Sequence, residues 1–533
     1  MKKTVCTLAA CLLFTAGTLA QGTALGDVVE IESGALRGAP RDANGVLVFK
    51  GIPYAAAPVG DLRWQAPQPV KSWQGTREAS RFGNRCWANV RVPELAGRGG
   101  GVSQDEDCLN VNVWTAAKSA NERRPVMVWV HGGGFQFGTS GDPNTDGGLL
   151  AQKGVVLVSL NYRLGVFGFF AHPQLRSEGR LSGNFGIQDQ IAALKWVKAN
   201  IANFGGDPNN VTILGESSGS QSVSLLMGSP MAKGLFHRAI GQSGSSLQQL
   251  PSLAEMGLRG AAFASAVGAS SVTKSIAELR AMPADRINTA ATWDFAGGAP
   301  MVFAPGIDGH VFPAGMEEVF RKGRQNDVPL LAGYNKREEF PFLAETLPHR
   351  NAAEFREAAQ LVFGPDRMQE FLSLYSADTD TLAKVSAEEL YADIRQKAET
   401  WAWLSLQSRT GKSAAYGYHF AYESPYSPVA SHVAEIAFVF GNLVPQFFAP
   451  KAPPAGAGDR KLAQELMSYW VNFATRGDPN GPDLPWWPEF RAKASLLQIQ
   501  EDGRISASPP SERQIARFRF LDGFLTSASL GQR

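Results

Sequence analysis

Short apolar runs separated by polar segments recur along the chain and predict buried strands. Continuous runs of four or five mostly apolar residues are typical of parallel strands that are buried on both faces. Apolar residues then recur at helical spacing from Ile187 to Ile201, and Phe204-Gly205-Gly206 ends this predicted helix. The order strand, helix, strand predicts a βαβ crossover and therefore an α/β sheet. The four runs are 126–130, 155–158, 211–214 and 329–332.

Three of these predicted strands end in segments that can take part in catalysis. Open α/β sheets place their chemistry beyond the carboxyl ends of their strands. One strand is followed by a run of glycines, the next by a serine between glycines, and the third by two adjacent carboxylates. These segments are 131–135, 215–219 and 333–339.

The serine segment carries the sharpest signal. Residues 215–219 read Gly-Glu-Ser-Ser-Gly, between a predicted strand and a helix that opens at Ser220. Glycines permit a turn tight enough to hold Ser217 in a strained conformation, because side chains at their positions would clash. The hydroxyl would then project from a helix N-terminus, where backbone amides favour developing negative charge. We predict that Ser217 is a nucleophile; the alternative is an ordinary helix cap.

The glycine run predicts the donors that such a nucleophile needs. Acyl transfer passes through an oxyanion, and a fixed backbone donor aimed at it contributes about 2.7–4 kcal/mol. Glycines let the main chain approach closely, so the predicted oxyanion hole consists of the amides of Gly133, Gly134 and Ser218. The alternative is a flexible hairpin tip.

A serine nucleophile also requires a base, and seven histidines compete for this role. His131 lies in the glycine-rich loop, where the backbone matters more than the side chain, and His419 lies in an alternating run that predicts a strand. His432 follows a loop rich in turn residues, where a late base is expected. The order Ser217, Glu338, His432 is the nucleophile–acid–base order of an α/β-hydrolase.

The N-terminal residues 1–20 predict a signal peptide rather than structure. A short basic start precedes an uncharged, largely apolar run, and small residues follow at the expected cleavage site. The mature chain is therefore expected to be exported, to the periplasm or the medium; a minor alternative is lipoprotein anchoring at Cys11. Only Cys86 and Cys108 remain after cleavage, and they pair readily in an exported chain. Two unpaired buried thiols are the alternative.

Charge and motif content exclude several other classes. The chain has 51 Lys and Arg against 49 Asp and Glu, and the leader holds two of the lysines, so no nucleic-acid or anionic-membrane partner is expected. No later apolar run reaches the roughly 18 residues of a membrane span. Residues 142–147 resemble the start of a calcium loop, but its twelfth position is Lys153 instead of glutamate, so no metal is predicted. No phosphate-binding or dinucleotide fingerprint follows any strand, and no cofactor is predicted.

The chain resembles the type-B carboxylesterases, a group that includes bacterial carboxylesterases, fungal lipases and cholinesterases. The resemblance covers nearly the whole mature chain, and many separated matches are more specific than any single motif. Besides the motifs above, the matching segments are 49–55, 58–64, 106–111, 161–163, 184–190, 242–244, 469–474 and 477–480.

The resemblance implies a single α/β-hydrolase domain over residues 21–533, whereas length alone suggests three or four domains. It implies a large, mostly parallel sheet flanked by helices, with helical insertions over the active site. It also implies a catalytic triad of Ser217, Glu338 and His432. No cofactor belongs to this chemistry, and the expected partner is a small-molecule ester.

Further residues acquire roles only from the resemblance. Cys86 and Cys108 match the first disulfide of the family, and Arg63 and Glu106 match a salt bridge beside it. Ser243 resembles a buried serine that supports the carboxylate of the triad.

The chain also departs from the family pattern. Glycine usually follows the acid, but Glu339 follows Glu338 here, so Glu339 is retained as an alternative acid. Ser218 stands where alanine is common, which leaves its backbone donor in place. The loop between the cysteines has only Trp87, directly beside Cys86, where cholinesterases carry a choline-binding tryptophan, and choline esters are therefore disfavoured.

The predicted function is hydrolysis of carboxylic esters through an acyl-enzyme on Ser217. The alternative from another class is a catalytically inactive binding or adhesion module, which would require the loss of a nucleophile, base or donor. Phe135, Phe137, Phe340 and Phe342 flank the motif loops and suggest a pocket for hydrophobic or aryl esters, unless they belong to the core.

The base must be neutral to accept the serine proton, and an unperturbed histidine titrates near pH 6.5. An ionised carboxylate beside it raises the pKa, whereas burial lowers it. From sequence, we expect kcat/KM to fall on the acid side with a single ionisation between about pH 5.5 and 7.5.

Overall fold

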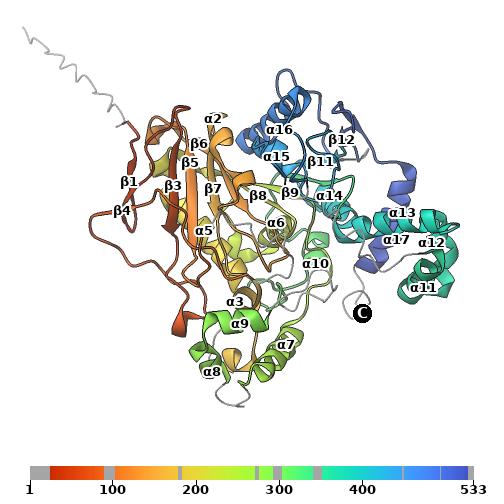
Figure 1. Ribbon diagram of the computed structural model, residues 1–533, viewed down its shortest axis with the longest axis horizontal. Helices are drawn as coiled ribbons and strands as arrows, with labels where there is room; N and C mark the ends of the chain where they lie inside the picture. The colour runs from red at the N-terminus through yellow and green to blue at the C-terminus, as the bar shows by residue number, and fades with distance from the viewer. Residues whose placement is uncertain are drawn as a thin grey trace, which may run out of the picture.

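A ten-stranded mixed sheet forms the centre of the molecule (Figure 1). The computed structural model describes residues 24–88, 102–177, 183–269, 275–291, 303–339, 351–446, 449–491 and 494–525. The predicted leader, residues 1–20, and the predicted pocket residues Phe340 and Phe342 lie outside these ranges. In sheet order the strands are β13 (Ile505–Ser508), β12 (Leu496–Ile499), β11 (Ala415–Phe420), β10 (Leu330–Asn335), β9 (Arg238–Gln242), β8 (Gly206–Glu216), β6 (Arg124–Val130), β7 (Val156–Leu160), β5 (Asn110–Thr115) and β3 (Leu47–Pro53).

The strands from β12 to β7 pair in parallel, and the strands outside them pair antiparallel at both edges. The four predicted strands are confirmed as parts of β6, β7, β8 and β10. A second, three-stranded sheet lies beside the first near the N-terminus. Its strands are β1 (Val28–Ile31), β2 (Gly34–Arg37) and β4 (Thr76–Glu78).

Alternate residues of β6 show that both faces of the large sheet are buried. Val126 and Val128 belong to one hydrophobic cluster, which includes Ile187 and Leu194 of the predicted crossover helix. Met127 and Trp129 belong to a second cluster on the other face, together with residues of two C-terminal helices. Helices on both faces of a mostly parallel sheet are the layer order that the apolar strands predict, and the α/β fold class is confirmed.

Helices lie in the connections between the parallel strands of the large sheet. The predicted crossover helix is confirmed as α5 (Phe185–Asn200). Two long connections, from β9 to β10 and from β10 to β11, carry most of the inserted helices. In Figure 1, α7 to α9 lie together at one end of the molecule, and α11 to α13 lie beside α17 at another. The other described α-helices are α2 (Gly148–Gln152), α3 (Gly165–Phe169), α4 (Pro173–Ser177), α6 (Ser218–Gly228), α7 (Leu253–Ala266), α8 (Ser275–Ala281), α9 (Ala284–Ala290), α10 (Met316–Arg321), α11 (Ala352–Phe363), α12 (Met368–Leu374), α13 (Asp380–Ala392), α14 (Ala398–Thr410), α15 (Ile436–Phe440), α16 (Ala457–Arg476) and α17 (Glu512–Leu525).

The pairing that the family resemblance implies near the N-terminus is present. Cys86 and Cys108 form a disulfide across 22 residues. In the chain-entropy view, closing a loop of this length stabilises the fold by about 3 kcal/mol. Beside it, Arg63 and Glu106 form a two-pronged ion pair, with nitrogen–oxygen distances of 2.7 and 2.6 Å.

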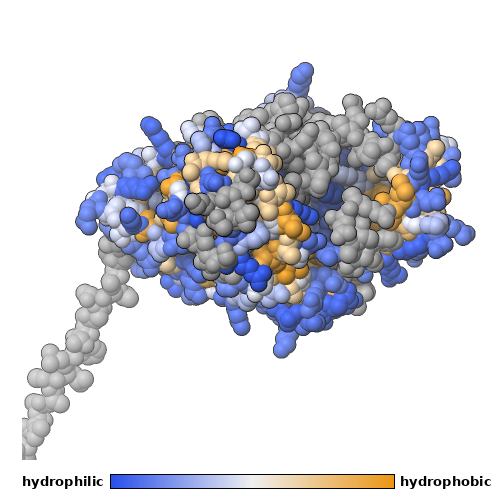
Figure 2. All heavy atoms as spheres, turned by 90° about the horizontal axis from the view of Figure 1, so that it is seen from below, coloured by the Kyte–Doolittle hydropathy of each residue, from blue (hydrophilic) through white to orange (hydrophobic). Residues whose placement is uncertain are grey.

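On the face seen in Figure 2, the coloured surface is mainly hydrophilic, and apolar side chains gather in a few places. On α11 and α13 the exposed large apolar residues are Leu361, Val362, Leu382 and Val385. In the part of the chain that the structure describes, no helix combines the length and the hydrophobicity needed to cross a bilayer.

Candidate active site

Ser217 lies in a sharp turn between β8 and α6 and has a strained backbone, with φ 56° and ψ −124°. Such a conformation costs about 1–3 kcal/mol for a residue with a side chain. The turn is possible because its flanking residues are glycines. A Cβ at Gly215 would lie 2.5 Å from the carbonyl oxygen of Gly219, and a Cβ at Gly219 would lie 2.1 Å from that of Val130. The serine is therefore held at the end of its strand as the motif predicts.

The glycine-rich loop after β6 lies directly against this turn. A Cβ at Gly132 would lie 2.7 Å from the Glu216 carbonyl oxygen and 3.1 Å from Cβ of Ser217. Gly133 and Gly134 both have positive φ, at 110° and 61°, conformations that favour glycine. The predicted backbone donors are thus beside the serine.

Ser218, the third predicted donor, is the first residue of α6. The backbone N–H groups in the first turn of a helix have no partner within the helix. Its amide is therefore available to a negative charge that develops next to Ser217.

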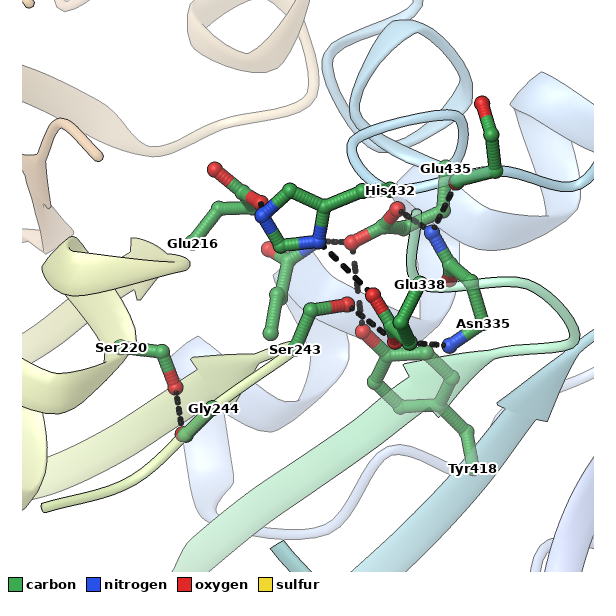
Figure 3. A network of polar contacts seen from close by, with 11 residues as sticks. Glu216, Ser220, Ser243, Gly244, Asn335, Glu338, Tyr418, His432 and Glu435 are labelled. Atoms are coloured by element: carbon green, nitrogen blue, oxygen red, sulfur yellow. Dashed lines mark hydrogen bonds and ion pairs between the residues drawn. The ribbon is translucent and has the colours of Figure 1, made fainter. Parts of the chain in front are cut away.

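His432 and Glu338 are in contact, as predicted. The Nδ1 atom of His432 lies 2.7 Å from Oε2 of Glu338, and both side chains are buried (Figure 3). The other carboxylate oxygen, Oε1, accepts a hydrogen bond from Ser243 Oγ at 2.9 Å and one from the backbone N–H of Asn335 at 2.6 Å. Ser243 therefore lies where the family resemblance implies.

Glu339, the alternative acid, lies elsewhere. Its Oε1 is 3.8 Å from the guanidinium of Arg337. Burial raises the pKa of Glu339, and the positive charges of Arg337 and Lys397 oppose that rise. The carboxylate that contacts the imidazole is therefore that of Glu338.

A second carboxylate reaches the imidazole from the other side, and the sequence analysis did not assign it. The Nε2 atom of His432 lies 3.0 Å from Oε1 of Glu216, the residue before Ser217. Burial by itself lowers the pKa of His432. The charge of Glu216, the hydrogen bond and charge of Glu338, and the charge of Glu435 together raise the pKa by more than burial lowers it. The pKa of His432 is raised to about 9.

The pKa of His432 therefore lies above the window of about pH 5.5 to 7.5 that the sequence analysis expects for the acid limb. That window allows for one carboxylate beside the base, whereas the folded chain places two against the ring of His432. Glu216 occupies the position that the general pattern Gly-x-Ser-x-Gly leaves unspecified, and its contact with a histidine more than 200 residues away appears only in three dimensions.

A third carboxylate, Glu435, links the strand ends behind His432 and Glu338 (Figure 3). Its Oε1 accepts from Nε2 of Gln242 at 3.0 Å, and its Oε2 accepts from Nδ2 of Asn335 at 2.6 Å. The same amide of Asn335 also donates to the carbonyl of Ser431. The carbonyl of Gln242 accepts from the backbone N–H of Ser217. Glu435 thus connects the segments that carry Ser217, Glu338 and His432.

Two of the histidines that are candidates for the base, His131 and His419, are held in place by neighbouring residues. Nδ1 of His131 lies 2.9 Å from the Gly132 carbonyl oxygen, and its ring stacks on Tyr162. His419 lies on β11, as predicted, with Nδ1 2.9 Å from Oε1 of Gln498. Burial lowers the pKa of each to about 4, so both are neutral near pH 7.

The aromatic residues of the glycine-rich loop differ in their placement. Phe135 is buried and packs edge-on against Phe169, with ring centroids 5.3 Å apart, so it belongs to the core. Phe137 is partly exposed beside Gly133. Of the predicted pocket residues that the structure describes, only Phe137 is therefore partly exposed.

The loop that resembles the start of a calcium site is a turn. Oδ1 of Asp142 accepts from the backbone N–H of Asn144, and Oδ1 of Asp146 accepts from that of Gly148. Within the described ranges, no group of three or more His, Cys, Asp or Glu residues is arranged to hold a metal ion.

A strained serine at a strand–helix turn, with an imidazole–carboxylate pair at the neighbouring strand ends, defines the class of the α/β-hydrolases. Residues 26–516 match the model of the carboxylesterase family, and the chain belongs to that family.

Characterised relatives extend over most of the chain. It is 37% identical to a fumonisin B1 esterase of Sphingopyxis macrogoltabida, over 90% of this chain and 88% of the relative. It is 32% identical to a para-nitrobenzyl esterase of Bacillus subtilis, over 91% of this chain and 97% of the relative. It is 33% identical to a liver carboxylesterase of Sus scrofa, over 90% of this chain and 88% of the relative. The protein is an enzyme that hydrolyses carboxylic esters, and nothing favours an inactive binding module.

The two carboxylates on His432 predict a pH dependence that Glu216 controls. Because the histidine must be neutral to act as a base and its pKa is raised to about 9, kcat/KM should fall as the pH decreases through that region. Glu216→Gln keeps the size and one oxygen acceptor but removes the charge, so the pKa of His432 and the acid limb of kcat/KM should move to lower pH. The measurement is kcat/KM against pH for a short acyl ester, corrected for spontaneous hydrolysis.

Glu465→Gln is the matched control, since that carboxylate pairs with Lys461 on α16 and its loss should leave the limb in place. An acid limb that is the same in wild type and Glu216→Gln would contradict the electrostatic role of Glu216.

Proposed function

We propose that Ser217, Glu338 and His432 form the catalytic triad of this esterase. The observation that carries the proposal is the 2.7 Å contact between His432 and Glu338 beside the strained serine turn. Burial on both sides of this contact excludes water, which strengthens the interaction between imidazole and carboxylate. Glu338 fixes the ring orientation and stabilises the imidazolium that forms during the reaction.

Acylation proceeds by attack of the Ser217 hydroxyl on the ester carbonyl. His432 accepts the hydroxyl proton as the new carbon–oxygen bond forms, and the carbonyl electrons move to the oxygen. This oxyanion binds the backbone amides of Gly133, Gly134 and Ser218. The tetrahedral intermediate collapses, the bond to the alcohol breaks, and His432 donates its proton to the leaving alcohol.

Deacylation repeats these steps with water. His432 removes a proton from water as it attacks the acyl-enzyme, the same amides hold the oxyanion, and the acid leaves as Ser217 regains its proton. Glu216 contributes to both half-reactions, since its charge stabilises the imidazolium and lies 3.0 Å from the nitrogen that transfers the proton.

We propose small-molecule esters as substrates, with an apolar or aryl portion. The partly exposed Phe137, beside the predicted donor Gly133, offers an apolar surface near the reacting centre. The names of two relatives, a para-nitrobenzyl esterase and a fumonisin B1 esterase, support substrates whose ester groups lie on aryl or bulky molecules.

We further propose that residues 1–20 are removed as a signal peptide, and that residues 21–533 form one domain that acts in the periplasm or outside the cell. The disulfide between Cys86 and Cys108 supports this, since such bonds persist in oxidising compartments. Anchoring at Cys11 as a lipoprotein is the minor alternative.

Replacing the nucleophile tests the proposed function most simply. Ser217→Ala should reduce kcat on p-nitrophenyl esters by about 10⁵- to 10⁶-fold, since loss of the nucleophile removes the acyl-enzyme route. A fluorophosphonate should label the wild-type enzyme on the peptide that contains Ser217, as mass spectrometry would show. Ser373→Ala, on the exposed surface of α12, is the control and should keep full activity. Labelling of a different serine, or retained turnover in Ser217→Ala, would refute the assignment.

Two neighbouring glutamates provide a matched test of the acid. Glu338→Gln should lower kcat by about 10³- to 10⁴-fold, because the ring of His432 loses its orienting charge. Glu339→Gln should change kcat little, since Glu339 faces Arg337 and not the imidazole. Steady-state kinetics on both purified variants, with circular dichroism to verify the fold, makes the comparison. A larger loss in Glu339→Gln would mean that the acid is wrong by one residue.

A further inference from the structure

A π-helical turn interrupts the long helical segment between α13 and α14. This turn, η8 (Asp393–Lys397), joins the two helices without a break in the chain. Single π-turns within α-helices are rare and often occur at functional sites. The last residue of the turn, Lys397, is only 5% exposed, and such burial is unusual for a lysine.

The ammonium group of Lys397 donates to the backbone of the acid loop (residues 336–339). Its Nζ lies 2.7 Å from the carbonyl oxygen of Lys336, two residues before Glu338. The backbone N–H of Lys336 donates to the carbonyl of Phe420 at 2.7 Å. Lys397 and β11 therefore hold this residue through both of its backbone groups.

Charged groups from several elements surround Lys397. Asp393 lies on the same turn, Glu339 on the acid loop, and His419 on the neighbouring strand β11; the charge of Lys397 acts on all three. From α17, Arg517 Nε lies 2.8 Å from Oδ2 of Asp393. The same oxygen accepts from the hydroxyl of Tyr375 at 2.8 Å. The C-terminal helix thus fixes the turn that carries Lys397.

We propose that Lys397 is a positioning residue for the catalytic acid. By holding the Lys336 carbonyl it fixes the path of the acid loop, so that Glu338 stays in hydrogen-bond contact with Nδ1 of His432. The inference rests on the proposed triad. It makes the position of Glu338 depend also on the helices inserted between β10 and β11, which carry Lys397. It makes that position depend on α17 as well, since Arg517 pairs with Asp393.

The alternative is that Lys397 has no effect on catalysis and only neutralises the charges of Asp393 and Glu339. The two roles differ in their effect on His432. A displaced acid loop weakens the bond between Glu338 and His432, which lowers the pKa of His432 and moves the acid limb of kcat/KM to lower pH. Loss of a nearby positive charge alone acts in the opposite direction, since it favours the imidazolium.

The test is Lys397→Met, which removes the donor and the charge but keeps an unbranched side chain. Fluorophosphonate titration counts the competent sites, so that kcat is expressed per site. Since misplacement by about 1 Å costs about 100-fold in rate, a partial displacement of the loop should lower kcat per site by about 10-fold with KM within about twofold. The acid limb should move to lower pH.

Lys153→Met is the matched control, because the Lys153 ammonium bonds Ser468 on α16 at 3.1 Å and should affect neither kcat nor the limb. Lys397→Arg keeps charge and donor and should restore the wild-type limb. If Lys397→Met does not fold, Lys397→Gln, a shorter uncharged donor, should shift the limb in the same direction.

An unchanged kcat per site, or a limb that stays in place or moves to higher pH, would overturn the positioning role. Failure of the wild-type enzyme to react with fluorophosphonate at Ser217 would instead refute the triad itself. The two failures are therefore distinguishable in one set of measurements.

Discussion

The imidazole of His432, held between the carboxylates of Glu338 and Glu216, is the interaction on which the rest of the site depends. Its Nδ1 is 2.7 Å from one carboxylate and its Nε2 is 3.0 Å from the other. Buried charges are costly unless each one is paired and hydrogen-bonded. Here two negative groups share one titrating ring, so protonation of His432 is favoured despite its burial. Neighbouring side chains must then supply the remaining hydrogen bonds.

Those neighbours come from the carboxyl ends of adjacent strands, which explains why the sheet has to be built before the site can exist. Ser243 follows β9, Asn335 ends β10, and both donate to Glu338. Gln242 ends β9 and joins Ser217 to Glu435. Parallel pairing of β8, β9 and β10 brings these ends together at one edge. The strained backbone at Ser217 persists because several surrounding hydrogen bonds hold the neighbouring segments in place.

Sequence patterns predicted the parts of this structure that depend on local chemistry. Apolar runs marked the central strands, the glycines around Ser217 required a tight turn, and chain order selected His432 and Glu338 from many candidates. The family resemblance added Ser243, which no local pattern around that residue indicated, and it agreed with the pairing that two cysteines in an exported chain already suggested.

Other features lay beyond reach of the sequence because they are contacts between distant segments. Glu216 fills a position that the serine motif leaves open, and Lys397 stands in an unremarkable helical stretch. Phe135 belongs to the core, although its place beside the glycine run suggested a pocket. The pKa of His432 lies above the expected pH window for the same reason, since it depends on how many carboxylates meet one ring.

The most direct test of this account is the titration of His432 itself. Histidine labelled with 13C at Cε1 would give one signal for each of the seven histidines, and His432→Gln would identify the signal in question by its absence. The account predicts that His432 titrates near pH 9, while His131 and His419 stay neutral down to about pH 4. A value for His432 at or below the ordinary pKa of about 6.5 would contradict it, because the ring could not then lie between two ionised carboxylates.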